Sequence, residues 1–319
     1  MNSKTHISRS IRGNRGAAAV ALAAATALLA GCSSDDGKSD NPLAEGKSSG
    51  DSVVVGSNNF PESTLLADIY GEALKAKGIK VTYRPNIGSR ETTYGLIKNG
   101  SISVLPEYNG SLLAYLDQKT APKSLADTTA AINAKLDSKL TLLDPAPAQD
   151  KDSVTVNAAT AKKYHLTEKS TIADLKDIAQ DLVIGASPEF QTRQQGLVGL
   201  KSVYGLEFKS FKALDAGGPL TLAALKKDAV QVADIFTTDA NITKEKFVVL
   251  RDPKNLFGFA NVQPLAYKGA LSKEGVSALN AVSAKLDTKT LLDLDTQVQA
   301  ENKDPLDVAK TWLKSAGLA

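Results

Sequence analysis

The chain has 319 residues, of which 38 are basic and 35 acidic, and its formal net charge at pH 7 is +3. Residues 1–31 hold four of the basic residues and no acidic one, so the rest of the chain is close to neutral. This balance argues against nucleic-acid binding. One cysteine and two histidines exclude an internal disulfide and a metal site of clustered cysteines or histidines. The length is sufficient for two domains of ordinary size.

The first segment has the three parts of an export signal. Basic residues precede an apolar run at 17–30, which is shorter than the roughly 20 residues that a membrane-spanning helix needs. The run ends in Leu29-Ala30-Gly31-Cys32, which resembles the lipobox of bacterial lipoproteins. We therefore expect a lipoprotein signal peptide at 1–31 and lipidation of Cys32, with the chain anchored after export on the outer face of the cytoplasmic membrane. An uncleaved anchor and an ordinary signal with an incidental cysteine are the alternatives.

Two blocks of alternating strands and helices follow a polar segment. The short apolar runs are typical of buried parallel strands, and the helices begin at glycine, serine or proline. The first block has predicted strands at 53–56, 79–83 and 102–105, the last stopping at Pro106, and helices at 61–77 and after the cap Ser89. The second has predicted strands at 182–185, 208–213 and 230–236, and helices opened by Ser187-Pro188-Glu189 and by Gly217-Gly218-Pro219.

Two such blocks predict an α/β protein with two lobes, each a mainly parallel sheet flanked by helices. One large doubly wound sheet is the alternative. The stiff stretch at 145–150 is suited to cross between the lobes, and 252–262 to return. The last helix begins at Asp304-Pro305 and is expected to bury Trp312. The predicted organisation is a flexible tether at 32–51, lobe I at 52–149 and 257–319, and lobe II at 150–256.

Two crossings make a hinge, and a hinged pair of lobes makes a cleft that is expected to close on a ligand. In open α/β sheets, ligands lie at the carboxyl ends of the strands beside helix N-termini, which favour anions. Arg193 could bind a carboxylate with both arms of its guanidinium, or form a surface salt bridge instead. Glu107 and Tyr108 could contact a ligand or form a buried structural pair.

Several segments together resemble the motifs of substrate-binding proteins of glycine betaine/choline-type osmoprotectant ABC importers. They lie in order along nearly the whole chain after the export signal. The matching segments are Gly56-Ser57-Asn58-Asn59-Phe60-Pro61-Glu62, Gly88-Ser89-Arg90, Pro106-Glu107-Tyr108-Asn109-Gly110, Pro145-Ala146-Pro147-Ala148 and Thr237-Thr238-Asp239.

The resemblance implies a type II periplasmic-binding-protein fold that closes on a small solute and delivers it to a membrane permease with its ATPase. It implies a monomer with no cofactor, no metal and no catalysis. Members of this family typically hold a trimethylammonium head in a box of tyrosines by cation–π attraction. They hold a carboxylate with an arginine, which here corresponds to Arg193.

This sequence departs from the family at the aromatic box. The usual tyrosine positions hold Leu105, Asp152, Phe236 and a residue near Ala260, beside Phe259. The resemblance as a whole implies a solute of the glycine betaine, choline or carnitine class. The residues themselves favour a more polar, carboxylate-bearing solute and predict weak or absent betaine binding.

The expected ligand-binding residues come from both lobes and both crossings. A surface lipoprotein enzyme using carboxylates such as Glu62, and a sensor subunit of a membrane kinase or receptor, are the alternative functions. The expected site consists of Asn58, Asn59, Phe60, Ser89, Arg90, Leu105, Tyr108, Asp150, Asp152, Glu189, Arg193, Phe236, Thr238, Asp239 and Phe259.

Overall fold

The computed structural model describes residues 52–120 and 124–319. The expected export signal, Cys32 and the expected tether lie outside these residues. Within the described ranges, no helix combines the length and the apolar character needed to cross a membrane.

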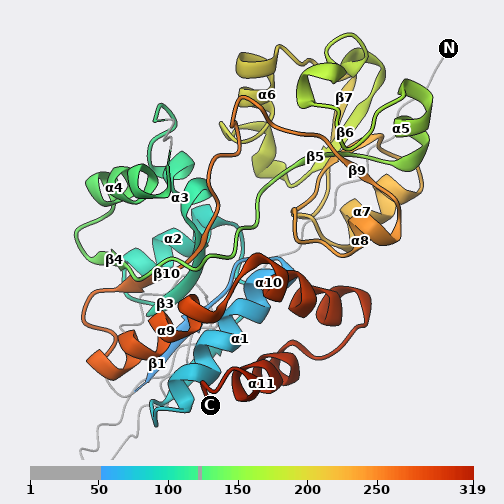
Figure 1. Ribbon diagram of the computed structural model, residues 1–319. Helices are drawn as coiled ribbons and strands as arrows, with labels where there is room; N and C mark the ends of the chain where they lie inside the picture. Colours follow the sequence, from blue (N-terminus) through green and yellow to red (C-terminus); the bar gives the residue numbers. More distant parts are fainter. Residues whose placement is uncertain (1–51, 121–123) are drawn as a thin grey trace, which may run out of the picture. The chain divides into compact units, whose positions relative to one another are not determined.

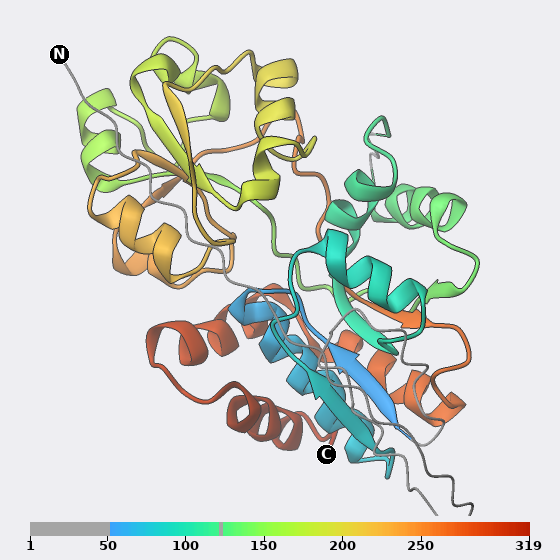
Figure 2. The same cartoon turned by 180° about the vertical axis from the view of Figure 1, so that it is seen from behind.

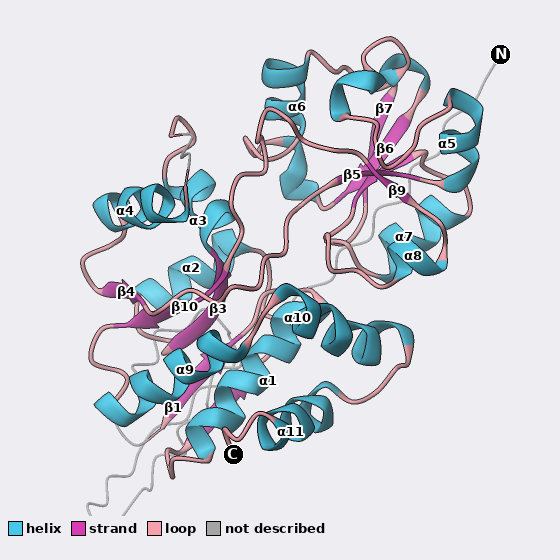
Figure 3. Ribbon diagram, viewed as in Figure 1, coloured by secondary structure: helices cyan, strands magenta, loops and turns pink. Residues whose placement is uncertain are grey.

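The described strands form two separate five-stranded sheets, coloured magenta in Figure 3. The first has the strand order β2-β1-β3-β10-β4, and the second has the order β7-β6-β8-β5-β9. In each sheet one strand, β10 or β5, runs antiparallel to both of its neighbours, and the other strands share one direction. The sheets are thus mixed, with the mainly parallel character that the sequence predicts.

The first sheet and its helices are built from both ends of the described chain, drawn blue to green and orange to red in Figure 1. Its strands are β1 (Val53–Gly56), β2 (Val81–Arg84), β3 (Val104–Tyr108), β4 (Leu140–Leu142) and β10 (Val262–Tyr267). Its helices are α1 (Pro61–Lys75), α2 (Arg90–Lys98), α3 (Asn109–Leu116), α4 (Leu125–Lys135), α9 (Lys273–Lys285), α10 (Thr288–Asp295), the π-helical turn Thr296–Ala300 and α11 (Pro305–Ser315).

The second sheet and its helices come from the middle of the chain. Its strands are β5 (Val154–Val156), β6 (Val183–Ala186), β7 (Ser210–Ala213), β8 (Val232–Asp234) and β9 (Val248–Val249). Its helices are α5 (Ala158–Tyr164), α6 (Leu197–Tyr204), α7 (Pro219–Lys226), α8 (Asn241–Lys244) and the 3₁₀ turns Ile172–Leu175, Ala179–Asp181 and Pro188–Gln191.

The hydrophobic cores separate the described chain into two lobes. Four clusters of buried apolar side chains pack on the two sheets, and among the described residues no cluster combines side chains from both sheets. An apolar layer on each sheet is what two separate α/β lobes require, whereas one doubly wound sheet would share a core. The core of the second lobe extends to Phe257, one residue past the expected boundary.

Helix α1 shows how the sequence produces one of these layers. Pro61 stands at the first helical position, where its missing N–H removes no intrahelical hydrogen bond. Leu65, Leu66 and Ile69 recur at helical spacing and are fully buried against the first sheet and α11. In α11 the fully buried side chains are Ala309 and Leu313, while Trp312 is only partly buried, which corrects the prediction for Trp312.

Two predicted elements differ most from the observed ones. Strand β3 does not stop at Pro106 but continues to Tyr108, because Pro106 lies opposite Pro264 of β10 and the two residues without an N–H share one position of the ladder. The helix expected from Ser187 is a single 3₁₀ turn, Pro188–Gln191. The first error decides where the site lies, because it moves the end of the strand by three residues.

The two crossings lie side by side and pair with each other. The first runs from β4 to β5 and the second from β9 to β10; both can be followed from behind in Figure 2. The Asp150 amide donates to the Ala260 carbonyl at 3.0 Å, and the Val262 amide donates to the Ala148 carbonyl at 3.0 Å. This short antiparallel pair joins the two crossings where they pass between the lobes.

Candidate functional site

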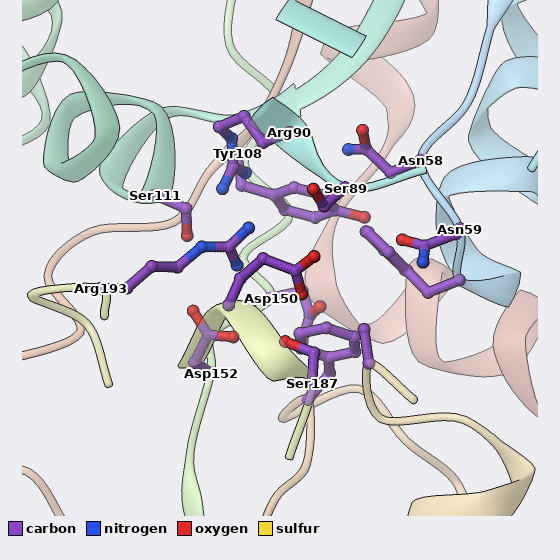
Figure 4. A pocket seen from close by; sticks show the side chains of 14 residues that line it. Asn58, Asn59, Ser89, Arg90, Tyr108, Ser111, Asp150, Asp152, Ser187 and Arg193 are labelled. Atoms are coloured by element: carbon purple, nitrogen blue, oxygen red, sulfur yellow. The ribbon is translucent and has the colours of Figure 1, made fainter. Parts of the chain in front are cut away.

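A pocket lies between the lobes where the carboxyl ends of the strands meet, and Figure 4 shows it from close by. Its enclosed volume is about 50 Å³, room for a few water molecules. Side chains reach it from both lobes and from the first crossing. The lining residues are Asn58, Asn59, Phe60, Ser89, Arg90, Tyr108, Ser111, Asp150, Asp152, Ser187, Glu189, Arg193, Ala216 and Phe236.

Three aromatic rings line this pocket. Phe60 caps the N-terminus of α1, Tyr108 ends β3, and Phe236 follows β8 of the second lobe. The Phe60 ring lies 5.9 Å from the Tyr108 ring and 5.0 Å from the Phe236 ring, centroid to centroid. Of the positions that correspond to the family's tyrosine box, Phe236 contributes a ring to this pocket. Phe60 and Tyr108 add two more rings, so the pocket is more aromatic than those positions alone indicated.

Two carboxylates enter the pocket from the first crossing. Asp150 is only 4% exposed, and its Oδ1 accepts hydrogen bonds from the Thr238 amide at 3.1 Å and the Thr237 hydroxyl at 3.2 Å. Burial, and then the charge of Glu62, raise the pKa of Asp150 well above its usual value. Asp152 lies two residues further along the same extended segment, so both side chains point to the same side.

Asp152 forms a carboxyl pair with Asp234 at the end of β8. Burial is the main cause that raises the pKa of both groups. For Asp234 the charge of Asp152 is the second cause. Its Oδ1 has no hydrogen-bond partner among the described residues, although the residue is only 5% exposed. Each of two neighbouring buried carboxyls makes ionisation of the other less favourable.

Arg90 is fully engaged with a carboxylate of its own lobe. Its Nε donates to both carboxylate oxygens of Glu107, at 3.0 and 3.1 Å, and its Nη2 donates to Oε2 at 3.0 Å. Glu107 is fully buried and also accepts from the Tyr108 amide at 3.1 Å. Burial opposes the charge on Arg90, but Glu107 outweighs it and raises the pKa of the guanidinium. Glu107 thus has the structural role that the sequence left open, with Arg90 as its partner.

Arg193 connects the two lobes. Its Nε donates to Glu91 Oε1 at 3.1 Å and its Nη2 to Glu91 Oε2 at 2.9 Å, so the arginine of the second lobe holds α2 of the first with both arms. Desolvation raises the pKa of Glu91, but hydrogen bonds from Arg193 and Ser89 outweigh it and lower the pKa to about 2. The guanidinium that we expected to bind a solute carboxylate is occupied by a carboxylate of the same chain.

A second acidic cluster lies behind the rings. Glu62 accepts from the Tyr108 hydroxyl at 2.5 Å and from the Thr238 hydroxyl of the second lobe at 2.6 Å. Burial, and then Asp295, raise the pKa of Glu62 well above its usual value. Burial also raises the pKa of Asp295 to about 7. Neither carboxylate oxygen of Asp295 has a hydrogen-bond partner within the described ranges. This cluster supports the rings and does not line the main pocket.

Four residues expected at the ligand site do not line the pocket. Leu105 is fully buried in the core between the first sheet and α2, because β3 continues past it. Thr238 and Asp239 line a smaller hollow beside Glu62. Phe259 lines another hollow with α3. The remaining expected residues line this one pocket: Asn58, Asn59, Phe60, Ser89, Arg90, Tyr108, Asp150, Asp152, Glu189, Arg193 and Phe236.

Sequence reasoning missed Ser111, Ser187 and Ala216 as lining residues and Glu91 as the partner of Arg193. Ser187 directly follows β6, and the position after a parallel strand was a signal that could have selected it. Ser111 lies in the first turn of α3, a helix that no pattern revealed. Among the residues that the structure describes, no group of three or more potential ligands could hold a metal ion.

Two α/β lobes, joined by two crossings and holding a small polar and aromatic pocket between them, define a two-lobed solute-binding protein. The family model for the substrate-binding domain of ABC-type glycine betaine transport systems (OpuAC) matches residues 51–315. The chain therefore belongs to this family of substrate-binding proteins of ABC importers. Members of the family are extracytoplasmic binding proteins.

Known relatives and solved structures agree with this assignment. The chain is 28% identical to the glycine betaine-binding protein YehZ of Escherichia coli (strain K12), over 83% of this chain and 90% of that protein. It is 26% identical to the carnitine transport binding protein OpuCC of Listeria monocytogenes, over 84% and 88%. The structure of apo YehZ matches with a TM-score of 0.58 at 26% identity, over 84% of this chain and 99% of that one. A glycine betaine/carnitine/choline ABC transporter structure shares the fold with a TM-score of 0.64 at 24% identity, over 83% and 99%.

Proposed function

We propose that this chain captures a small cation-headed solute of the glycine betaine, carnitine or choline class between its lobes and delivers it to an ABC permease. The relatives named for these solutes support the solute class. The residues that line the pocket support a positively charged head group. Those relatives are transport binding proteins, and we propose that this chain likewise has no catalytic step of its own.

The observation that carries the proposal is the charge pattern of the pocket. Each of its arginines is already bound by a glutamate, Arg90 by Glu107 and Arg193 by Glu91. Asp150 and Asp152 face the same space as the three rings. A cation gains both from the negative faces of aromatic rings and from nearby carboxylates. A free anion would meet two guanidinium groups whose charge is already compensated by glutamates.

The remaining polar groups fit the other end of such a solute. Asn59, Ser111 and Ser187 offer amide and hydroxyl groups around the pocket (Figure 4). The N-terminus of α2, at Ser89 and Arg90, adds backbone N–H groups that favour partial negative charge. A carboxylate or hydroxyl of a zwitterion or amino alcohol would be held there. The arginine clamp expected from the sequence would require Glu91 to release Arg193.

Isothermal titration calorimetry of the purified chain with glycine betaine, choline and carnitine tests this function. We expect saturable binding of at least one of them, and a ligand at 100 times its Kd should stabilise the fold by about 2.7 kcal/mol. Phe236→Ala should weaken binding by roughly 30-fold, the equivalent of about 2 kcal/mol for a desolvated cation–π contact. Phe208→Ala, an aromatic of the same lobe outside the pocket, is the control. No binding of any of these solutes or their less methylated analogues at millimolar concentration would contradict the proposal.

We also propose that Cys32 anchors the chain by a lipid at the outer membrane face and that the folded part acts as a monomer. The proposal rests on the lipobox-like segment before Cys32. Metabolic labelling with a fatty-acid analogue should mark the parent chain and leave Cys32→Ala unlabelled. Equal labelling of the two would show that the anchor is elsewhere.

A further inference from the structure

We infer that Glu91 determines specificity: it takes the place of a solute carboxylate on Arg193, and so selects a choline-type solute over glycine betaine and carnitine. The three solutes share a trimethylammonium head. Glycine betaine and carnitine carry a carboxylate at the other end, whereas choline carries a hydroxyl. This inference rests on the proposed function and narrows its substrate class.

The ion pair between Glu91 and Arg193 has the geometry of a carboxylate clamp. Arg193 Nε and Nη2 each donate to a different carboxylate oxygen of Glu91, at 3.1 and 2.9 Å. Two parallel hydrogen bonds of this kind are how a guanidinium binds a carboxylate most specifically. Glu91 belongs to the same chain, so its local concentration at Arg193 exceeds that of a dilute solute. A solute carboxylate that used this edge of Arg193 would first have to displace it.

Glu91 also uses other groups that favour an anion at this side of the pocket. It lies in the first turn of α2, where the helix N-terminus stabilises a negative side chain. Its carboxylate accepts hydrogen bonds from the Ser89 side chain and from its own backbone N–H. Ser89 and Arg193 both line the main pocket. Two donors that could hold a solute carboxylate are therefore already bound to Glu91.

The rest of the Arg193 guanidinium is no better a place for a solute carboxylate. Arg193 reaches into the pocket in Figure 4, and Asp152 lines the same pocket and interacts with its charge. An arriving carboxylate would be the third acidic group around one positive charge, after Glu91 and Asp152. Its attraction to Arg193 would be offset by repulsion from these neighbours.

Arg90 cannot substitute for Arg193. It is the other basic residue among the described residues that line the pocket. Three hydrogen bonds bind it to Glu107, and the pair is buried. Asp150 and Glu189 add further acidic groups to the lining. A solute carboxylate thus finds both guanidinium groups of the pocket already neutralised.

A hydroxyl at the polar end of the solute needs no charged partner. Asn59, Ser111 and Ser187 line the pocket with one amide and two hydroxyls, which can both donate and accept hydrogen bonds. The trimethylammonium head keeps its contacts with the aromatic rings whatever the other end is. Choline is therefore complementary to the pocket at both of its ends, whereas glycine betaine and carnitine are complementary at one.

Calorimetry with choline, glycine betaine and carnitine tests the inference, because the head group is constant while the other end changes. We expect the parent chain to bind choline at least about tenfold more tightly than glycine betaine, whose carboxylate lacks a charged partner. Glu91→Gln releases Arg193 and should lower the ratio of the choline and betaine association constants by at least about tenfold, mainly by strengthening betaine. Carnitine should gain in the same way. Adding Arg193→Gln to this variant should remove the gain, because the guanidinium is then absent.

Glu207→Gln is the matched control, because Glu207 forms an exposed ion pair with Lys201 at 2.8 Å and does not line the pocket. It should leave all three affinities unchanged. An equal change for the three solutes in Glu91→Gln would mean that the ion pair only holds the lobes together, and would overturn the inference.

Tightest binding of glycine betaine or carnitine by the parent chain would also overturn the inference, and would leave the proposed function standing. Failure of all three solutes to bind both the parent chain and Glu91→Gln would overturn the proposed function and the inference together.

Discussion

The charged residues of the pocket act mainly on one another. Arg90 and Glu107 form three hydrogen bonds in a fully buried position, and each of the two compensates the desolvation of the other. Replacing such a pair as a whole costs little, but removing one partner leaves a buried charge without compensation. At the residue scale, the pocket is thus rigid on the Arg90 side and adjustable on the Arg193 side, where the ion pair is partly exposed.

Arg90→Ala should lower the free energy of unfolding by about 3–5 kcal/mol, because Glu107 then stays buried and unpaired. Urea denaturation followed by circular dichroism measures this loss. Lys98→Ala is the control: it breaks the exposed Lys98–Asp137 pair and should cost no more than about 1 kcal/mol. Equal costs for the two variants would show that the buried pair contributes no more than a surface one.

The sequence selected most of the residues that line the pocket but not their hydrogen-bond partners. Strand ends and glycine-containing turns are local features, and they selected Asn58 and Arg90, which line the pocket together with Arg193. Which carboxylate binds which guanidinium depends on long-range geometry, since Glu91 and Arg193 are 102 positions apart. Leu105 was misplaced because a proline normally ends a strand, and nothing local revealed that Pro264 would lie opposite it.

At the scale of elements, the strands that follow the crossings were the hardest to predict. β5 has only three residues, and β10 contains a proline, so neither has the alternation that identifies a strand. Helix α3, NGSLLAYL, is apolar nearly all round and has no polar face to reveal its period. These elements are fixed by tertiary contacts. One of those contacts requires a glycine, since a Cβ on Gly110 of α3 would lie 1.8 Å from the Phe259 carbonyl oxygen.

Gly110→Ala should therefore destabilise the protein by about 1–3 kcal/mol or more, because α3 must move away from the return crossing. Gly95→Ala is the opposite case, as Gly95 lies exposed inside α2 with no atom near the added methyl group. That variant should be more stable than the parent by about 0.5–1 kcal/mol. Thermal unfolding of the two variants side by side gives the signs, and a stable Gly110→Ala variant would disprove the tight approach of α3.

For the whole molecule, the buried acids connect stability to pH. Glu62 receives a hydrogen bond from Thr238 of the second lobe, and Asp295 lies beside it without a hydrogen-bond partner in the described chain. The pKa of Asp295 is raised from 3.8 to about 7. Between these values the folded chain keeps a proton that the unfolded chain has lost. The stabilising effect is complete below about pH 4 and is lost as the pH rises to about 7.

Asp295→Asn should remove this dependence, because an amide does not ionise. At pH 8 we expect the variant to be more stable than the parent by on the order of 4 kcal/mol, and at pH 4 the two should be similar. Urea unfolding at several pH values provides the comparison. Asp293→Asn, an exposed position on the same helix, should follow the parent within about 0.5 kcal/mol. Parallel curves for the parent and Asp295→Asn would show that Asp295 is ionised at no cost in the fold.

The two-lobed architecture itself was predictable, because the repeated order of strands and helices already requires two sheets. The antiparallel direction of β10 and β5 was not predictable, because it follows from the path of the crossing that precedes each strand and not from the residues of the strand itself.

The strand order of the first sheet also has a consequence for how the protein is made. β3 pairs with β10, and the ribosome produces β10 only after every strand of the other sheet. At about 5–20 residues per second, the edge of β3 waits on the order of ten seconds for its neighbour. The middle lobe has all of its strands by then, so it can assemble early, while an open strand edge of the other lobe is available for wrong pairing. A chain kept unfolded until its synthesis is finished would avoid that interval.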